Sequence, residues 1–398
     1  MAIHGNPGGF VTAATPTVTT SSAQGIWTKT KQLVYQAAGS WPSPPVFQLW
    51  TWGWSIYGQL GLGNTTNYSS PKQVGALTTW SSVAVGNFAT SALQNGQLWT
   101  WGKGATYGQL GLGNLTDYSS PKQVGALTAW SINSLGSGSF AAVKTDGTLW
   151  GWGRNDFGQV GLGNTTIYSS PKQVGALTAW AKVAAGQSAT AAIKTDGTLW
   201  TWGRGALGSL GLGNTTSYSS PKQVGALTNW SYLGVGSGSY SFAAIKTDGT
   251  LWTWGWNTCG QLGHGNTTTY SSPKQVGALT TWSSVFGGEY FIAARKTDGT
   301  FWSWGKNSLG QLGLGNTTYY SSPKQVGSLT TWSSGSAGRN SCSAIKTDGT
   351  LWTWGQNNRG QLGLGNITDY SSPKQVGALT TWLSVKNGFG HTVATKSL

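Results

Sequence analysis

A unit of about fifty residues recurs seven times from residue 46 onward, and no other feature constrains the fold as strongly. Each copy carries the motif LWTWG or a close variant, whose first tryptophan recurs every 49 to 52 residues. These tryptophans are Trp50, Trp99, Trp150, Trp200, Trp252, Trp302 and Trp352. Such a period, in a chain with 62 glycines and 25 tryptophans, is typical of a β-propeller rather than a helical solenoid.

Each copy can be divided into four short strands. In one copy, we predict three strands at AKVAAG (181–186), TAAIK (190–194) and TLWTWG (198–203). A short outer strand is predicted at PKQV (221–224). The TDG sequence between the second and third strands is a hairpin signal, because Asp and Gly adopt the turn conformation readily. The two tryptophans of LWTWG are two residues apart, so we expect both rings on one face of the strand, between blades.

The ends of the repeat region predict how the ring closes. The last copy stops at HTVATKSL, after its second strand, and the first copy begins with VFQLWTWG, the missing third strand. We therefore predict an all-β fold: a seven-bladed β-propeller of four-stranded blades over residues 46–398. One blade would be shared between the N- and C-terminal parts, which leaves no open sheet edge.

The repeat resembles that of the RCC1 (regulator of chromosome condensation) family. The pattern V-x-x-G, A-I-K-T-D-G-T-L-W-T-W-G, G-Q-L-G-L-G, P-K-Q-V runs over residues 46–398. The resemblance implies a seven-bladed propeller, but it leaves function open, because that fold serves nucleotide exchange on a small GTPase, chromatin binding, ubiquitin-ligase accessory roles and β-lactamase inhibition. The family often has a histidine after the first strand of a blade, and here only His391 keeps it.

Residues 1–45 differ from the repeat and form the predicted N-terminal anchor or linker. They lack the basic start and apolar core of a secretory signal peptide. TPTVTTSSAQG is typical of a linker, and GIWTKTKQLVYQAAGSW predicts a short helix. Its anchor residues would be Ile26, Trp27, Leu33, Val34 and Trp41. The segment either packs on the propeller or docks into a larger assembly, and it resembles N-terminal stretches of phage particle proteins.

The formal net charge of +15 raises the question of nucleic-acid binding. Half of the 24 basic residues lie in two repeated motifs, PKQV and KTDG. They are Lys72, Lys122, Lys172, Lys222, Lys274, Lys324 and Lys374, and Lys144, Lys194, Lys246, Lys296 and Lys346. A DNA-binding surface concentrates its charge on one face, whereas these lysines are dispersed. Specific nucleic-acid binding is therefore the lesser alternative.

The scarcity of acidic residues argues against an enzyme. Only nine exist, and five of them belong to TDG turns. The other four, Asp117, Asp156, Glu289 and Asp369, lie in different copies, and their spacing does not predict a catalytic pair. Cys259 and Cys342 form no metal-binding motif. We expect no catalytic residues, no metal and no cofactor.

The copies differ mainly in two short segments, one after WG and one after the glycine that ends the first strand. Because strands one and three run in the same direction, both segments should lie at the same end of the ring. They are rich in aromatic and basic residues, which supply binding hot spots and stack on sugars. Random sequence drift in exposed loops would instead favour Ser, Gly and Asn. The predicted ligand-binding face comprises Trp54, Tyr57, Phe88, Tyr107, Arg154, Phe157, Arg204, Tyr240, Trp256, Tyr290, Lys306, Arg339, Arg359 and Phe389.

These patterns predict a non-enzymatic binding protein on the surface of a phage particle, as a tail fibre, decoration or receptor-binding component. Residues 1–45 would contact other virion proteins, and the variable face would bind a host glycan or surface protein, without membrane insertion. The protein would be extracellular, and several copies would strengthen binding. One alternative is an intracellular, cytoplasmic module that binds a GTPase or chromatin. Another is a secreted enzyme inhibitor.

Overall fold

The computed structural model describes residues 17–18, 23–24, 47–77, 79–236 and 238–398. The chain divides into two units, Met1–Val46 and Phe47–Leu398. In the first unit, β1 (Thr17–Val18) and β2 (Ala23–Gln24) pair antiparallel within the segment predicted to be a linker. The predicted helix and its anchor residues lie outside the described residues, so the anchor stays a prediction.

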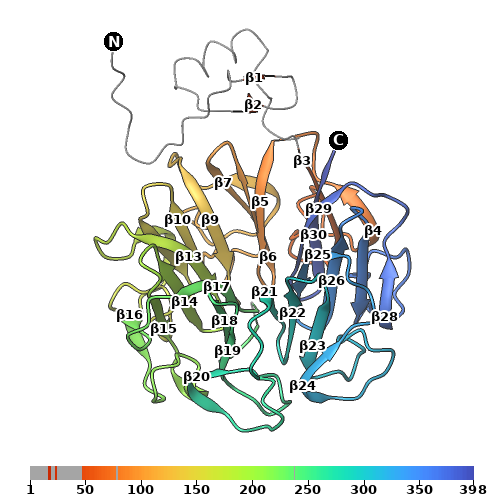
Figure 1. The fold of residues 1–398 in the computed structure, drawn as a ribbon. Helices are drawn as coiled ribbons and strands as arrows, with labels where there is room; N and C mark the ends of the chain where they lie inside the picture. The colour runs from red at the N-terminus through yellow and green to blue at the C-terminus, as the bar shows by residue number, and fades with distance from the viewer. Residues whose placement is uncertain (1–16, 19–22, 25–46, 78, 237) are drawn as a thin grey trace, which may run out of the picture. The chain divides into compact units, whose positions relative to one another are not determined.

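The second unit is a ring of seven four-stranded antiparallel sheets, which confirms the predicted seven-bladed propeller (Figure 1). The first strands of the blades are β5 (Trp80–Val85), β9 (Trp130–Leu135), β13 (Trp180–Ala185), β17 (Trp230–Gly234), β21 (Trp282–Gly287), β25 (Trp332–Ala337) and β29 (Trp382–Asn387). The second strands are β6 (Ala89–Gln94), β10 (Ser139–Lys144), β14 (Ala189–Lys194), β18 (Ser241–Lys246), β22 (Phe291–Lys296), β26 (Ser341–Lys346) and β30 (His391–Ser397).

The third and fourth strands complete each blade. The third strands are β7 (Gln97–Gly102), β11 (Leu149–Gly153), β15 (Leu199–Gly203), β19 (Leu251–Gly255), β23 (Phe301–Gly305), β27 (Leu351–Gly355) and β3 (Phe47–Gly53). The fourth strands are β8 (Tyr118–Gln123), β12 (Tyr168–Gln173), β16 (Tyr218–Gln223), β20 (Tyr270–Gln275), β24 (Tyr320–Gln325), β28 (Tyr370–Gln375) and β4 (Tyr68–Gln73). In the described part of the chain, the one helix is the 3-10 turn η1 (Ala206–Gly208), and no helix there could span a membrane.

The ring closes as predicted, through a blade built from both ends of the second unit. Its strand order is β29-β30-β3-β4, and β30 pairs with β3 from Phe47↔Ser397 to Gly53↔His391. Figure 1 shows β29 and β30 beside β3. Because β30 lies between β29 and β3, the two halves of the blade hold each other in place by backbone hydrogen bonds.

The core lies between adjacent blades and is organised by three tryptophans per blade. In the blade that starts at β5, Trp80 packs edge-to-face or tilted against both Trp99 and Trp101 of the LWTWG motif. Trp101 is fully buried, and its indole N–H donates to the Gln59 carbonyl of the preceding blade at 3.0 Å. The equivalent bond recurs in every blade at 2.9 to 3.1 Å. The second indole of each LWTWG motif is thus satisfied across a blade junction, whereas Trp80 Nε1 has no partner among the described residues.

The GQLGLGN loop needs its glycines for this tryptophan contact. Gly61 has φ +73°, and a Cβ there would lie 2.7 Å from the indole nitrogen of Trp101. A side chain at this position would be strained by its backbone angle and would collide with the next blade. The same approach recurs at the six equivalent glycines.

One local prediction is wrong in detail. The outer strand begins at the tyrosine of YSSPKQ, three residues before the predicted PKQV, and the register shifts opposite Pro71. The asparagines of the NTT, NLT and NIT triplets do not use a left-handed backbone, because among the described residues only Asn95, Ala129 and Leu207 combine a side chain with positive φ. Instead, Asn64 Oδ1 accepts the N–H of Thr66 and closes the turn through its side chain.

Candidate functional site

The two variable segments of each blade meet at one end of the ring. The backbone N–H that follows WG donates to the carbonyl just before the second strand of the same blade. Examples are Lys103 to Phe88 at 2.9 Å and Arg154 to Gly138 at 2.8 Å. We call this end the tip face: the loops after the first and third strands. The TDG turns lie at the opposite end of the strands, so this predicted placement is confirmed.

Four aromatic rings gather where the shared blade meets the blade that starts at β5. Trp54, Tyr57, Phe88 and Phe389, here called the Trp54 cluster, have contacting ring centroids 5.3 to 6.3 Å apart. They come from three loops of two blades, and all four are half-buried. Their mutual packing holds each ring in one orientation and leaves part of each ring exposed.

Cations surround the Trp54 cluster. Arg359 Cζ lies 3.5 Å from the centroid of Trp54, and Arg339 Cζ lies 4.0 Å from that of Phe389. Lys103 Nζ lies 4.7 Å from the tyrosine ring of the cluster. All three are within the range of a favourable cation–π contact.

A second aromatic cluster lies across the blades that start at β17 and β21. Trp256 contacts Tyr240 and Tyr290 edge-to-face, with centroids 5.7 and 5.1 Å away; we call these three the Trp256 cluster. Arg204 lies 5.5 Å from the ring of Tyr240, and Lys306 lies 5.2 Å from that of Tyr290. Burial raises the pKa of Tyr290, so its hydroxyl is protonated at neutral pH and can donate a hydrogen bond.

Two further cation–π contacts complete the tip face. Arg154 Cζ lies 5.4 Å from the ring centroid of Tyr107, and Arg204 also lies 4.9 Å from that of Phe157. All fourteen predicted face residues are therefore in ring or cation contacts at this end of the molecule. The prediction omitted Lys103, although it holds the same position after WG as Arg154 and Arg204 and could have been found by that alignment.

The four carboxylates outside the TDG turns all have partners. Asp156 and Glu289 accept hydrogen bonds from Arg154 and Arg339, each at 2.6 Å. Asp117 and Asp369 accept backbone N–H groups of tip-face loops at 2.6 to 2.9 Å. No ion pair between described residues involves the other tip-face cations, which are Lys103, Arg204, Lys306 and Arg359. The tip face thus carries cations that no carboxylate of the described chain neutralises.

The described residues contain no cluster of three or more His, Cys, Asp or Glu that could hold a metal ion. Cys259 is half-buried on a tip-face loop, and Cys342 is buried in the core, where burial raises its pKa. His391 is buried, and burial lowers its pKa to about 3, so it is neutral at physiological pH. His391 Nε2 lies 3.0 Å from Thr90 Oγ1, but both groups are buried and the threonine hydroxyl donates to the Gln59 carbonyl, so they form no accessible nucleophile–base pair.

Family models match most of the repeat region. The model of the RCC1-like domain matches residues 134–394, and that of the Regulator of chromosome condensation (RCC1) repeat matches residues 48–93 and 95–141. No curated protein matches the chain.

Solved structures share the same fold. Human WBSCR16 superposes with a TM-score of 0.78 at 21% identity, covering 88% of this chain and 99% of its own. Prp20p from Saccharomyces cerevisiae superposes with a TM-score of 0.79 at 20% identity over 89% of this chain and 93% of its own. Yeast RCC1 (Prp20) in a structure with Kap60 gives 0.80 at 20% identity, covering 100% of this chain and 96% of its own. At these identities the likeness is one of fold. The repeat-family matches and the closed ring of seven blades together place this chain in the RCC1-like family.

Proposed function

We propose that this protein is a non-enzymatic interaction module that binds an acidic surface of another protein through its tip face. The observation that carries the proposal is the set of four cations, Lys103, Arg204, Lys306 and Arg359, that lie over aromatic rings without a carboxylate partner among the described residues. Arginine and aromatic side chains are the commonest hot spots of protein interfaces.

The packing of these groups favours binding in a second way. Each cation is held against a ring, and the rings of the Trp54 and Trp256 clusters hold one another. Because their conformations are already restricted, less side-chain entropy is lost when a partner binds. A carboxylate that meets Arg359 or Arg204 would form a charge-assisted hydrogen bond beside a flat apolar surface.

The structural neighbours support a protein partner. One solved structure of yeast Prp20p is described together with its binding to Gsp1p and histones, and another contains Kap60. The particle-surface role, the extracellular location and the host-glycan ligand predicted from the sequence have no comparable support. The first two depend on residues 1–45, nearly all of which lie outside the described residues, and the third depends on the tip face; all three stay predictions.

The test measures binding of the full chain to purified Gsp1p, to core histones and to a glycan array. The tip variant is Arg204→Ala/Arg359→Ala. Its control is Lys72→Ala/Lys122→Ala, which removes two lysines of the outer strands β4 and β8, outside the tip-face loops, that lie 5.5 Å from the rings of Tyr68 and Tyr118. We expect a protein partner to bind the wild type and the control equally, and the tip variant to bind it at least tenfold more weakly, equivalent to about 1.4 kcal/mol.

Two outcomes would contradict the proposal. Equal binding by the tip variant and the wild type would remove the tip face as the site. Binding to glycans alone, lost in the tip variant, would instead support the adhesion role predicted from the sequence.

A further inference from the structure

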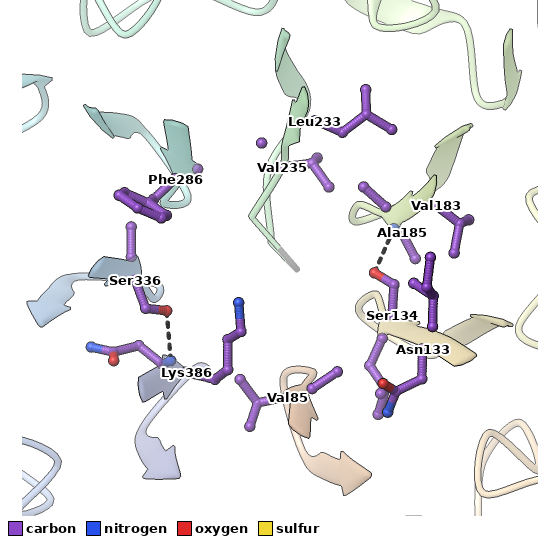
Figure 2. Close-up of a pocket in the computed structure, with 18 of the residues that line it drawn as sticks. Val85, Asn133, Ser134, Val183, Ala185, Leu233, Val235, Phe286, Ser336 and Lys386 are labelled. Atoms are coloured by element: carbon purple, nitrogen blue, oxygen red, sulfur yellow. Dashed lines mark hydrogen bonds between the residues drawn. The ribbon is translucent and has the colours of Figure 1, made fainter. Parts of the chain in front are cut away.

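The first strands of all seven blades line a cavity at the centre of the ring. It has a volume of 310 Å³ and is bounded by residues of β5, β9, β13, β17, β21, β25 and β29 (Figure 2). Most of the wall is apolar or small, with Val85, Val235 and Phe286 among its side chains. The cavity is distinct from the tip face, because its lining comes from strands rather than from the variable loops.

One charged side chain lies in this wall, that of Lys386 on β29, as far as the described residues go. Figure 2 shows it reaching from β29 toward the middle of the cavity. The equivalent positions of the other six first strands carry no charge; they are Ala84, Ser134, Ala184, Gly234, Phe286 and Ser336. A cation in this place is therefore a feature of one blade and not a requirement of the repeat.

The ammonium group of Lys386 lacks a counter-charge. It has no hydrogen bond or ion pair with any described residue, and none of the seven first strands contains Asp or Glu. Glu289, in the loop after β21, pairs with Arg339. The second lysine of the inner strands, Lys182, adds positive charge and lies 5.6 Å from the ring of Tyr232. The cavity is thus electropositive, and because the side chain of Lys386 is exposed to this space, its ammonium group is accessible to an anion.

Two serine hydroxyls add hydrogen-bond donors to the same wall. Ser336 Oγ accepts the backbone N–H of Asn387 at 2.9 Å, and Ser134 Oγ accepts that of Ala185 at 2.9 Å (Figure 2). Since each oxygen is already an acceptor and donates to no described group, its own proton remains free for a ligand. Ser336 lies on β25, next to β29, so its hydroxyl and Lys386 belong to adjacent strands.

We propose that the central cavity binds a small organic oxyanion, through a phosphate or carboxylate group held by Lys386 and Ser336. The apolar body of the ligand would pack against Phe286, Val85 and Val235, and the hydroxyl of Ser134 would donate to a second polar atom. Ammonium and hydroxyl donors without nearby acceptor charge are the groups that recognise such anions. The surrounding strands lower the pKa of Lys386 by partial desolvation, although the side chain is exposed to the cavity; a bound anion would oppose this shift, because it favours the charged ammonium.

The test is calorimetric titration of the full chain with inorganic phosphate, phenyl phosphate and benzoate. The phosphate and carboxylate arms distinguish the two headgroups, and the aromatic probes test the apolar wall. We expect one-to-one binding of at least one aromatic probe. That binding should weaken at least tenfold in Lys386→Met and stay unchanged in Lys72→Met, an outer-strand control.

A second readout is independent of binding heat. In trace acetylation followed by peptide mass spectrometry, the bound probe should slow modification of Lys386 several-fold and leave Lys72 unaffected. If Lys386→Met does not fold, as judged by tryptophan fluorescence and melting temperature, Ser336→Ala replaces it and should weaken binding as well. Absence of saturable binding for all three anions, or equal affinity in the folded variants, would overturn the proposal. Neither result would bear on the tip face.

Discussion

His391 is a residue that the other copies of the repeat lack, and its ring is held by a hydrogen bond. Its Nε2 lies 3.0 Å from Thr90 Oγ1, and that hydroxyl donates its proton to the Gln59 carbonyl at 2.7 Å. Nε2 must therefore carry a proton and act as the donor, which leaves Nδ1 buried with no partner among the described groups. A second proton on this ring would have no acceptor, and burial lowers the pKa to about 3.

This shift predicts that acid weakens the fold. Above pH 6.5, the ordinary histidine pKa, His391 is neutral in both folded and unfolded chains and has no effect. Between pH 6.5 and about 3, only the unfolded chain binds the proton, so the free energy of unfolding falls by about 1.4 kcal/mol per pH unit. Denaturation at pH 7.5 and pH 5 should differ by about 2 kcal/mol from this residue.

The matched variant is His391→Phe, because Phe291 holds the equivalent position in another blade. The variant should lose the share that His391 contributes, about 2 kcal/mol between pH 5 and pH 7.5. A comparable dependence should remain from half-buried His264, whose pKa burial lowers to about 4. The same pH dependence in both proteins would show that His391 is protonated in the folded chain without penalty.

At the residue scale, the sequence indicated which positions lie on the tip face, but it did not indicate which side chains contact one another. Alternation along the first strand could have identified Lys386 as facing the cavity, and alignment after WG could have identified Lys103. The contact of Arg359 with Trp54 could not be foreseen, because the two residues lie in neighbouring blades about 300 positions apart, and the shape of the ring brings their loops together.

At the scale of the element, the hairpin between the second and third strands is built from side-chain hydrogen bonds. Asp146 accepts from the Thr148 hydroxyl at 2.6 Å, and the same hydroxyl accepts the indole N–H of Trp150 at 2.9 Å. The blade that starts at β5 has a shorter turn, in which Asn95 and Gly96 both have positive φ. There, Trp99 Nε1 has no partner among the described residues.

This difference predicts two opposite changes in stability. Thr148→Val removes the acceptor of Trp150 and the donor to Asp146, and should lower the free energy of unfolding by about 1 kcal/mol. Gln97→Thr places a hydroxyl two residues before Trp99, as in the five blades with a TDG turn, and should raise the free energy of unfolding by about 0.5 to 1 kcal/mol. Urea denaturation measures both; a destabilised Gln97→Thr would show that the shorter turn cannot present the hydroxyl to the indole.

The strands were the most predictable elements, since LWTWG and TDG mark the third strand and its turn in most copies. The outer strand was misplaced because Pro was taken as its beginning, whereas the register shift opposite Pro71 lets the strand continue through it.

At the scale of the whole molecule, stability depends on one junction. β30 pairs with β29 on one side and over seven residues with β3 on the other. Each of the other blades is formed from a continuous stretch of chain, so only this blade joins the two ends of the ring. The sequence predicted this closure, because the missing strands of the last copy are present at the start of the first.

Deletion of residues 391–398 should therefore disrupt more than one blade. It leaves β3 and β29 without their shared neighbour, and we expect loss of the cooperative melting transition that the full chain should show. A synthetic peptide of residues 391–398, added in excess, should restore the transition, and a peptide with the same residues in scrambled order should not. An unchanged melting temperature after the deletion would show that the remaining blades form a stable open ring.

The shared blade also orders events during synthesis. β3 and β4 are made before any complete blade, yet the edge of β3 stays unpaired until β30 has emerged from the ribosome, more than 300 residues later. For most of translation the nascent protein thus exposes a strand edge that could pair with a neighbouring chain on the same messenger. Chaperone capture of β3, or slow initiation that spaces the ribosomes, would protect it until the ring closes.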